Sequence, residues 1–314
     1  MPQPQRQPQR QPEHPEQRAG IIAGATAYLV WGLLTIYWKQ LRDFNAFELI
    51  GWRISVSALL MVGALTLTRR WGHLAAIRHD RRLVIRIVAA AVFLSVNWTT
   101  YVWAVVNGHV LETALGYFIA PLGTVAVGVL VLHEPLRMAQ RVAISLAAAA
   151  VVVLTVSNGR VPWIALAMAT TWTLYGYLKK QVPLSPLESM AAESFVLVVP
   201  AVALAIAFAG RAGSIPNSAS GVELAYAVFT GAVTVAPLML FAYAAQRVPL
   251  TIIGPMQYIV PSMNFVIGWW LYDEALPPLR VVGFGLVWTG LAIMTIDSAQ
   301  RAHQARSSIP IPTP

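Results

Sequence analysis

Two ionisable residues, Arg53 and Glu193, lie inside long apolar stretches of this chain, 140 residues apart. A charge in hydrocarbon is costly, so such residues are candidates for gating, ion coupling or substrate contact. The Arg53 guanidinium could contact an anion, or it could be a structural anchor that reaches the headgroups. Glu193 could carry a proton, or it could be a silent, neutral carboxylic acid. Glu112, near the end of another apolar stretch, is the expected partner of Arg53, because depth separates Arg53 from Glu193.

Two prolines, Pro121 and Pro261, share the same 140-residue spacing and also lie inside apolar stretches. At a rise of roughly 1.5 Å per residue, both are about 16 Å deep, near the middle of a hydrocarbon core about 30 Å thick. A proline inside a helix frees one carbonyl group, which is tolerated at that depth only against protein or a wet cavity. The pair therefore predicts two repeat-related broken helices beside a binding site.

Amide and phenol side chains accompany these prolines and also stand in the third apolar stretch. In hydrocarbon they need hydrogen-bonding partners, which either a cavity or neighbouring helices can supply. Asn97 and Tyr101 are four residues apart and share one helix face. The residues expected to line a substrate cavity are Asn97, Tyr101, Tyr117, Pro121, Gln257, Tyr258, Pro261 and Asn264.

The elements that must position these groups are membrane-spanning helices. The chain is 57% hydrophobic and 11% charged, whereas soluble domains carry roughly 25% charged residues, so a soluble globule is excluded. Most of the apolar stretches approach the roughly 20 residues that a span needs. The ten predicted spans are 20–38, 47–67, 83–105, 110–132, 139–156, 161–178, 189–209, 222–245, 250–272 and 279–296.

The gaps between these spans recur with a shift of about 140 residues, and Glu48 and Glu188 match at that shift. Five spans per half is an odd number, so the second half must enter the membrane from the opposite face. We therefore predict an all-α polytopic membrane protein of ten transmembrane helices in two inverted five-helix repeats. The expected divisions are a disordered tail at 1–19, repeats at 20–157 and 158–298, and a disordered tail at 299–314.

The basic residues indicate the orientation of the spans. Sixteen of the 22 Lys and Arg residues fall on the side that holds both termini, five fall on the other side, and Arg53 lies within a span. The positive-inside rule places both termini in the cytoplasm. This distribution explains the net charge of +9 and favours lipid headgroups over nucleic acid as partners.

Motifs for catalysis are missing from the sequence. There is no phosphate-binding loop, no H-E-x-x-H, no G-x-S-x-G and no cysteine. We expect no enzyme activity, no metal, no cofactor and no use of ATP. Glu274 precedes a helix and is expected to mark that helix start. Small residues at 147–150 and 283–290 predict close packing of the fifth and tenth spans, either within the chain or in a homodimer.

The stretch 97–140, which contains N-W, Y-x-W-A, E-x-x-L-G-Y-F-x-x-P-L and E-x-L-x-x-x-Q, resembles the RarD-type permeases. These belong to the EamA branch of the drug/metabolite transporter superfamily. W-G-L-L-T-I-Y-W-K at 31–39 and Q-Y-I-x-P at 257–261 agree, so the resemblance covers about 20–298. It implies two inverted five-helix repeats in the bacterial inner membrane and a cavity lined by the fourth and ninth spans, among others. Trp52 replaces a usual His before Arg53, which weakens any mechanism built on a His-Arg pair, and His133 replaces a usual Gly.

These features together predict a secondary transporter that exports a small metabolite or drug-like solute by alternating access. The alternative is a membrane scaffold or sensor without net transport. The duplicated prolines favour transport, because a scaffold needs no irregular backbone at the midplane.

Overall fold

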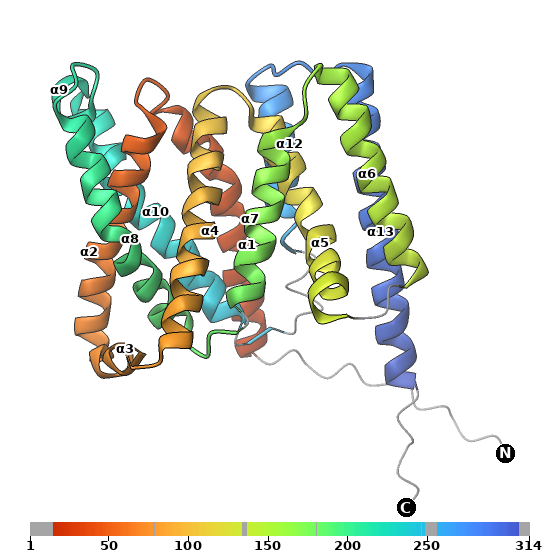
Figure 1. Ribbon diagram of the computed structural model, residues 1–314, viewed down its shortest axis with the longest axis horizontal. Helices are drawn as coiled ribbons and strands as arrows, with labels where there is room; N and C mark the ends of the chain where they lie inside the picture. Colours follow the sequence, from red (N-terminus) through yellow and green to blue (C-terminus); the bar gives the residue numbers. More distant parts are fainter. Residues whose placement is uncertain are drawn as a thin grey trace, which may run out of the picture.

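The computed structural model describes residues 15–77, 79–133, 137–179, 181–245, 247–248 and 256–307. These residues form helices that run side by side (Figure 1). The helices are α1 (Pro15–Lys39), α2 (Ala46–Thr68), α3 (Trp71–Ile77), α4 (Arg81–Val106), α5 (Val110–Leu132), α6 (Met138–Asn158), α7 (Trp163–Lys179), α8 (Pro186–Ala209), α9 (Ile215–Ser218), α10 (Gly221–Ala245), α12 (Ile259–Val266), the π-helix η1 (Ile267–Leu271) and α13 (Pro278–Ser307).

The short helices α3 and α9 lie at opposite ends of the bundle (Figure 1). We call these the α3 end and the α9 end. The α4–α5 turn and the connection from η1 to α13 lie at the α9 end, and α1 begins at the α3 end. The long helices therefore alternate in direction from one end to the other.

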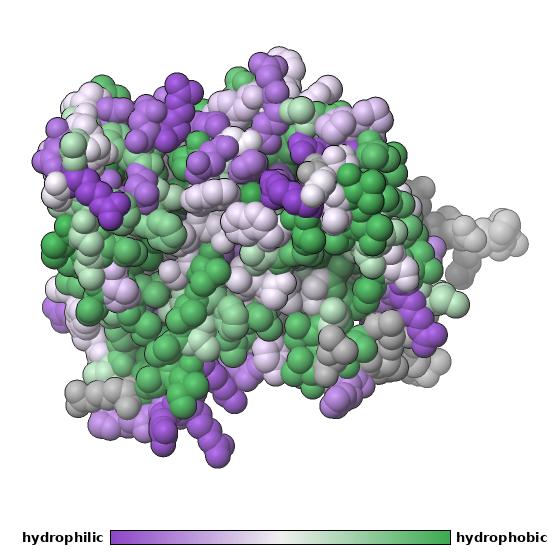
Figure 2. Space-filling model, turned by 45° about the horizontal axis from the view of Figure 1, so that its top comes forward, coloured by the Kyte–Doolittle hydropathy of each residue, from purple (hydrophilic) through white to green (hydrophobic). Residues whose placement is uncertain are grey.

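Eight helices in the described ranges are long and apolar enough to cross a membrane, namely α1, α2, α4, α5, α6, α8, α10 and α13. α7 has 17 residues, and Ile259–Leu271 is shorter. Large apolar side chains face outward, such as Leu67, which is 86% exposed, and Trp270, which is 75% exposed. Figure 2 shows hydrophobic surface between two hydrophilic ends. This is the surface of a polytopic all-α membrane protein.

The predicted break at Pro121 is wrong. α5 runs from Val110 to Leu132, as expected for the fourth span, and Pro121 lies inside it. A proline removes a single helical hydrogen bond, and α5 is held along its length by α7 and α12. The lost bond therefore does not interrupt the helix.

The prediction is closer at the second proline. Gln257 and Tyr258 form a turn, and α12 begins at Ile259, so Pro261 lies in the first turn of a helix. The N–H groups of a first turn have no intrahelical partner, so proline costs little there. The earlier part of the predicted ninth span, residues 249–255, lies outside the described residues.

Both predicted tails are shorter than expected where the structure describes them. α1 begins at Pro15 and α13 continues to Ser307, so residues 15–19 and 299–307 are helical. His133, where the family usually has glycine, follows α5 with φ of 53°. A left-handed backbone at a helix end is the conformation that glycine adopts most readily.

The helices pack in corresponding pairs. α4 packs against α7 and α10 packs against α1, while α2 contacts α8 and α6 contacts α13. The small residues of α6 and α13 are used within the chain, because a Cβ on Gly283 would lie 2.6 Å from Leu154 Cγ. The intrachain alternative therefore accounts for Gly283 and Gly290, and the homodimer stays a prediction.

Candidate functional site

Arg53 lies on α2 with only 4% of its surface exposed. By helix rise, it is about 10 Å from the first residue of α2, which lies at the α9 end. Its Cζ atom is 4.0 Å from the ring centroid of Trp98 and 5.4 Å from that of Trp38. Its Nε has no hydrogen-bond partner. Among the described residues, no carboxylate forms an ion pair with this guanidinium.

The expected pairing of Arg53 with Glu112 is wrong. Glu112 Oε1 lies 2.5 Å from Arg160 Nη2 and 3.9 Å from His109 Nδ1. Glu112 is in the first turn of α5, at the α9 end, and Arg160 belongs to the α6–α7 connection at the same end. The carboxylate is therefore bound to a basic residue nearer the bundle end, and Arg53 is left deeper without it.

Three phenol groups, those of Tyr37, Tyr101 and Tyr117, lie near the Arg53 guanidinium. The Tyr37 hydroxyl donates to the Tyr226 carbonyl. Thr35 Oγ1 donates to Asn264 Oδ1 at 2.7 Å, so its contact with the Tyr101 hydroxyl, at 2.9 Å, must be one that it accepts. Two of the three phenols thus give their protons to protein acceptors.

The Tyr117 hydroxyl differs from the other two. It makes no hydrogen bond to any part of the chain that the structure describes. Unlike the Arg53 Nε atom, it is not a fully buried atom. The Tyr117 ring lies 6.0 Å from the rings of Tyr101 and Trp172. The Tyr117 hydroxyl is therefore a free donor, and Tyr117 lies near the Arg53 guanidinium.

A buried hydrogen-bond network fixes the helices around Arg53. Asn264 Nδ2 donates to Thr113 Oγ1 at 3.4 Å, in addition to the bonds among Thr35, Tyr101 and Asn264. The network joins α1, α4, α5 and α12. It connects two predicted cavity residues, Tyr101 and Asn264, through Thr35, and Tyr101 lies near Arg53.

The remaining predicted cavity residues lie elsewhere. Asn97 donates to the Met168 carbonyl and to Thr171 Oγ1, each at 3.0 Å, so its amide binds α7. Tyr258 lines a shallow groove of about 380 Å³ with Phe118 and Trp288. The other three are Gln257, which is exposed, Pro121, which is half-buried, and Pro261, which is buried.

Glu193 lies on α8 in a different environment. Its Oε1 is 2.5 Å from Lys179 Nζ and accepts from Ser189 Oγ at 3.1 Å, while Oε2 accepts from the Tyr175 hydroxyl at 3.3 Å. The carboxyl group of Glu193 is therefore paired with a cation, so Glu193 is not a buried acid without a partner. As expected from depth, Glu193 and Arg53 form no ion pair with each other.

Aromatic rings connect the two charged positions. Tyr117 lies 6.0 Å from Trp172, whose ring lies 5.7 Å from Tyr175, and the Tyr175 hydroxyl reaches Glu193. Trp172 is 37% exposed. The rings thus form a continuous line from the Arg53 region toward the α3 end.

Sequence reasoning misplaced the role of Glu274. It does not cap the following helix but accepts hydrogen bonds from Val110 N at 2.6 Å and Leu111 N at 2.8 Å, at the start of α5. Burial raises the pKa of the Glu274 carboxyl group, and this outweighs the lowering by the two N–H groups and by Lys39. A contact between distant segments therefore closes the α9 end. The 140-residue match with Glu134 is the signal in the sequence, but Glu134 lies outside the described residues.

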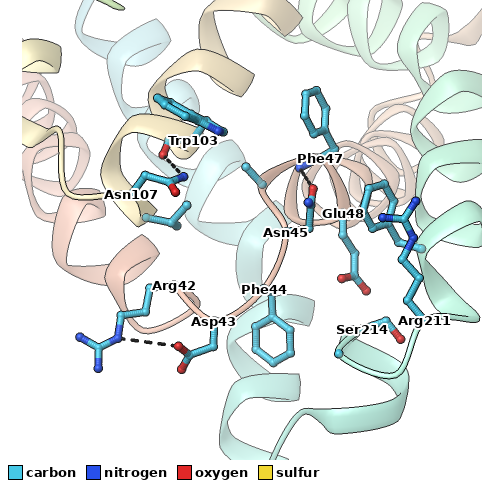
Figure 3. A pocket seen from close by; sticks show the side chains of 14 residues that line it. Arg42, Asp43, Phe44, Asn45, Phe47, Glu48, Trp103, Asn107, Arg211 and Ser214 are labelled. Atoms are coloured by element: carbon cyan, nitrogen blue, oxygen red, sulfur yellow. Dashed lines mark hydrogen bonds and ion pairs between the residues drawn. The ribbon is translucent and has the colours of Figure 1, made fainter.

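A polar pocket of about 440 Å³ opens at the α9 end, with Arg42 and Arg211 on opposite sides (Figure 3). Glu48 lines it and accepts a hydrogen bond from Ile215 N at 2.8 Å. This pocket was not predicted. Within the described ranges, no group of three or more His, Cys, Asp or Glu side chains could hold a metal ion.

Comparisons with known proteins agree with this architecture. The sequence model of the EamA-like transporter family matches residues 18–156 and 161–296. The chain is 43% identical to Protein RarD of Streptomyces exfoliatus over 302 residues, 95% of each chain. It is 32% identical to the Bacillus subtilis protein named Uncharacterized transporter YojE, covering 94% of this chain and 99% of that one. It is 31% identical to Protein RarD of Escherichia coli, covering 90% and 96%.

A solved crystal structure shares the fold with a TM-score of 0.56, at 18% identity, over 90% of this chain and 98% of the other. The family match and the relatives span nearly the whole bundle, including the segments that carry Arg53 and Glu193. The chain therefore belongs to the EamA-like transporter family as a RarD-type permease, and it is a multi-pass bacterial membrane transporter.

Proposed function

We propose that this protein is a secondary transporter that exports a small metabolite or drug-like solute by alternating access, without ATP. The observation that carries the proposal is the buried Arg53 guanidinium with no acidic partner among the described residues. A charge left unneutralised inside a membrane protein marks a place where a solute or ion passes. The line of rings from Tyr117 to Tyr175 supports a route that starts there.

We further propose that residues 20–157 and 158–298 are inverted five-helix repeats, giving ten spans. The family model matches the two halves separately. The pairing of α4 with α7 and of α10 with α1 supports an exchange of equivalent helices between the halves. Two positions related by the 140-residue shift, His133 and Asp273, also share a left-handed backbone, with φ of 53° and 50°.

In the proposed orientation both termini are cytoplasmic, in the bacterial inner membrane, and the α9 end faces outward. Three side chains at the α9 end, those of Trp38, Leu41 and Val110, are fully buried. Alternating access would require this end to open, which means releasing Glu274 from the start of α5. That contact joins the two proposed halves and, in this proposal, holds the outer end closed.

The proposal is tested in two steps. Untargeted metabolite profiling of cells that lack or overproduce the protein should show solutes that accumulate when it is missing. Purified protein in proteoliposomes should then move those solutes without ATP, and a pH gradient should reveal any proton coupling. Flat flux across a broad metabolite panel would favour the scaffold or sensor instead.

The prediction that Gln257 lines the cavity has its own test. Gln257→Ala should slow flux in proteoliposomes while leaving insertion and folding intact, because Gln257 is exposed and lies before α12. Gln40→Ala is the matched control, since Gln40 is also exposed and binds only the Ile36 carbonyl. Equal flux for both variants would remove Gln257 from the cavity.

A further inference from the structure

We propose that Arg53 and Tyr117 bind the carboxylate of a monoanionic organic substrate whose apolar part lies against Trp98. The inference rests on the proposed function, because it names the class of solute for that site.

The first step of the argument is the unused capacity of Arg53. Its contacts with Trp98 and Trp38 are made through the ring faces. A guanidinium carries five N–H donors in its own plane, and a cation–π contact uses none of them. With no hydrogen-bond acceptor among the described residues, the donors have the fork geometry that a carboxylate matches.

The second step identifies the other donor. The Tyr37 hydroxyl donates a hydrogen bond to the Tyr226 carbonyl, and the Tyr101 hydroxyl donates one to Thr35 Oγ1. The Tyr117 hydroxyl is an unused donor, because it makes no hydrogen bond in the parts of the chain described. A carboxylate has room for several donors, so it could accept from Arg53 and Tyr117 together.

The third step sets the charge of the ligand. The acids that could compensate Arg53 already have basic or backbone partners. Glu48 accepts a hydrogen bond from Ile215 N, Glu112 binds Arg160, Glu193 binds Lys179, and Glu274 binds the start of α5. This leaves one uncompensated positive charge at Arg53. A monoanion neutralises it, whereas a dianionic phosphate would bring a second buried charge without a partner. The geometry therefore favours a monocarboxylate.

The aromatic residues around Arg53 indicate the chemical character of the rest of the ligand. Trp38 is fully buried, and its Nε1 has no hydrogen-bond partner. The Trp98 ring lies 4.0 Å from the guanidinium, and the rings of Tyr101 and Tyr117, 6.0 Å from each other, lie near it. Aromatic rings of this kind bind flat or apolar groups, while a few polar atoms fix the orientation.

The test uses pairs of compounds that differ only in charge: benzoate with benzamide, and indole-3-acetate with indole-3-acetamide. Binding to the full-length protein in lipid nanodiscs is measured by calorimetry and by the shift in melting temperature. The acids should bind and the amides should not. Arg53→Gln should weaken acid binding roughly 30-fold or more, and Tyr117→Phe roughly 10-fold.

Arg42→Gln is the matched control, because it removes the same charge from an exposed position near the α9 end. It should bind the acids as the unaltered chain does. Equal binding of acids and amides, equal binding by Arg53→Gln, or no response to any compound would each overturn the proposal. Transport of neutral solutes without acid binding would overturn it while sparing the proposed function, whereas acid binding without any flux would do the reverse.

Discussion

Arg53 and Glu193 occupy positions related by the 140-residue shift, on two helices, α2 and α8, that pack against each other. Glu193 is bound by Lys179, Ser189 and Tyr175, whereas the Arg53 guanidinium lies over aromatic rings and has no ion-pair partner among the described residues. Leaving one charge of a buried pair without its partner costs about 3–5 kcal/mol, of which cation–π contacts return roughly 2 kcal/mol. The two sites therefore differ: the protein neutralises one charge, and we propose that a ligand neutralises the other.

The largest expected effect breaks the neutralised site. Lys179→Met should lower the free energy of unfolding by about 3 kcal/mol, because it leaves the buried Glu193 carboxylate without its cation. Chemical denaturation in detergent micelles, followed by tryptophan fluorescence, measures the change. Lys179→Arg keeps the charge and should lose much less. A loss below about 0.5 kcal/mol would mean that Glu193 does not depend on this partner.

The next effect concerns the rings around the unpaired site. Trp98→Leu should destabilise the unaltered protein by about 2 kcal/mol more than it destabilises an Arg53→Met variant, because the cation–π contact exists only when Arg53 is present. The four proteins of this double-mutant cycle are compared by the same denaturation. Trp163→Leu, which changes a tryptophan at the α9 end that makes no cation–π contact with Arg53, should show equal losses in both backgrounds. Equal losses for Trp98→Leu would show that Arg53 gains nothing from the ring.

A smaller effect has the opposite sign. Arg53→Met should leave the free energy of unfolding unchanged or raise it by about 1 kcal/mol, because removing an unpaired buried charge strands no partner. Acid binding should be lost in the same variant. If Arg53→Met instead destabilised the protein as much as Lys179→Met, then Arg53 would be a structural anchor and the contrast between the two sites would fail.

The smallest effect checks the corrected pairing of Glu112. Glu112→Gln and Arg160→Gln should couple by about 0.5–1 kcal/mol, a low value because the Arg160 side chain is 42% exposed. The changes in the free energy of unfolding caused by Glu112→Gln and by Arg53→Met should be additive within about 0.3–0.5 kcal/mol. Thermal unfolding of the single and double variants distinguishes the two cases. Coupling between Glu112 and Arg53 would restore the pairing that the sequence predicted.

Several features of the site were predictable from positions along the chain. The absence of an Arg53–Glu193 ion pair followed from depth, since Arg53 lies about 10 Å from one end of its helix and Glu193 is near the opposite end of the bundle. The bounds of α5 were predicted as 110–132 and are confirmed. Tyr101 and Asn264 were expected to line a cavity, and the hydrogen bonds that connect them through Thr35 fit that proposal without testing it.

Other features depended on contacts between helices. Lys179 is 14 residues from Glu193 in sequence, and the partnership needs the end of α7 to meet the start of α8. The break expected at Pro121 was absent because neighbouring helices hold α5. Asn97 was grouped with Tyr101 from their shared spacing, yet its amide binds α7.

The sequence by itself determined that this chain spans a membrane, where most helices lie and which positions the 140-residue shift relates. These properties depend on apolar length and spacing, which are local along the chain. Only the tertiary structure decided which buried charge has a partner and which phenol is left without a hydrogen-bond acceptor. Those outcomes depend on how each helix is rotated about its axis, and packing between helices sets that rotation.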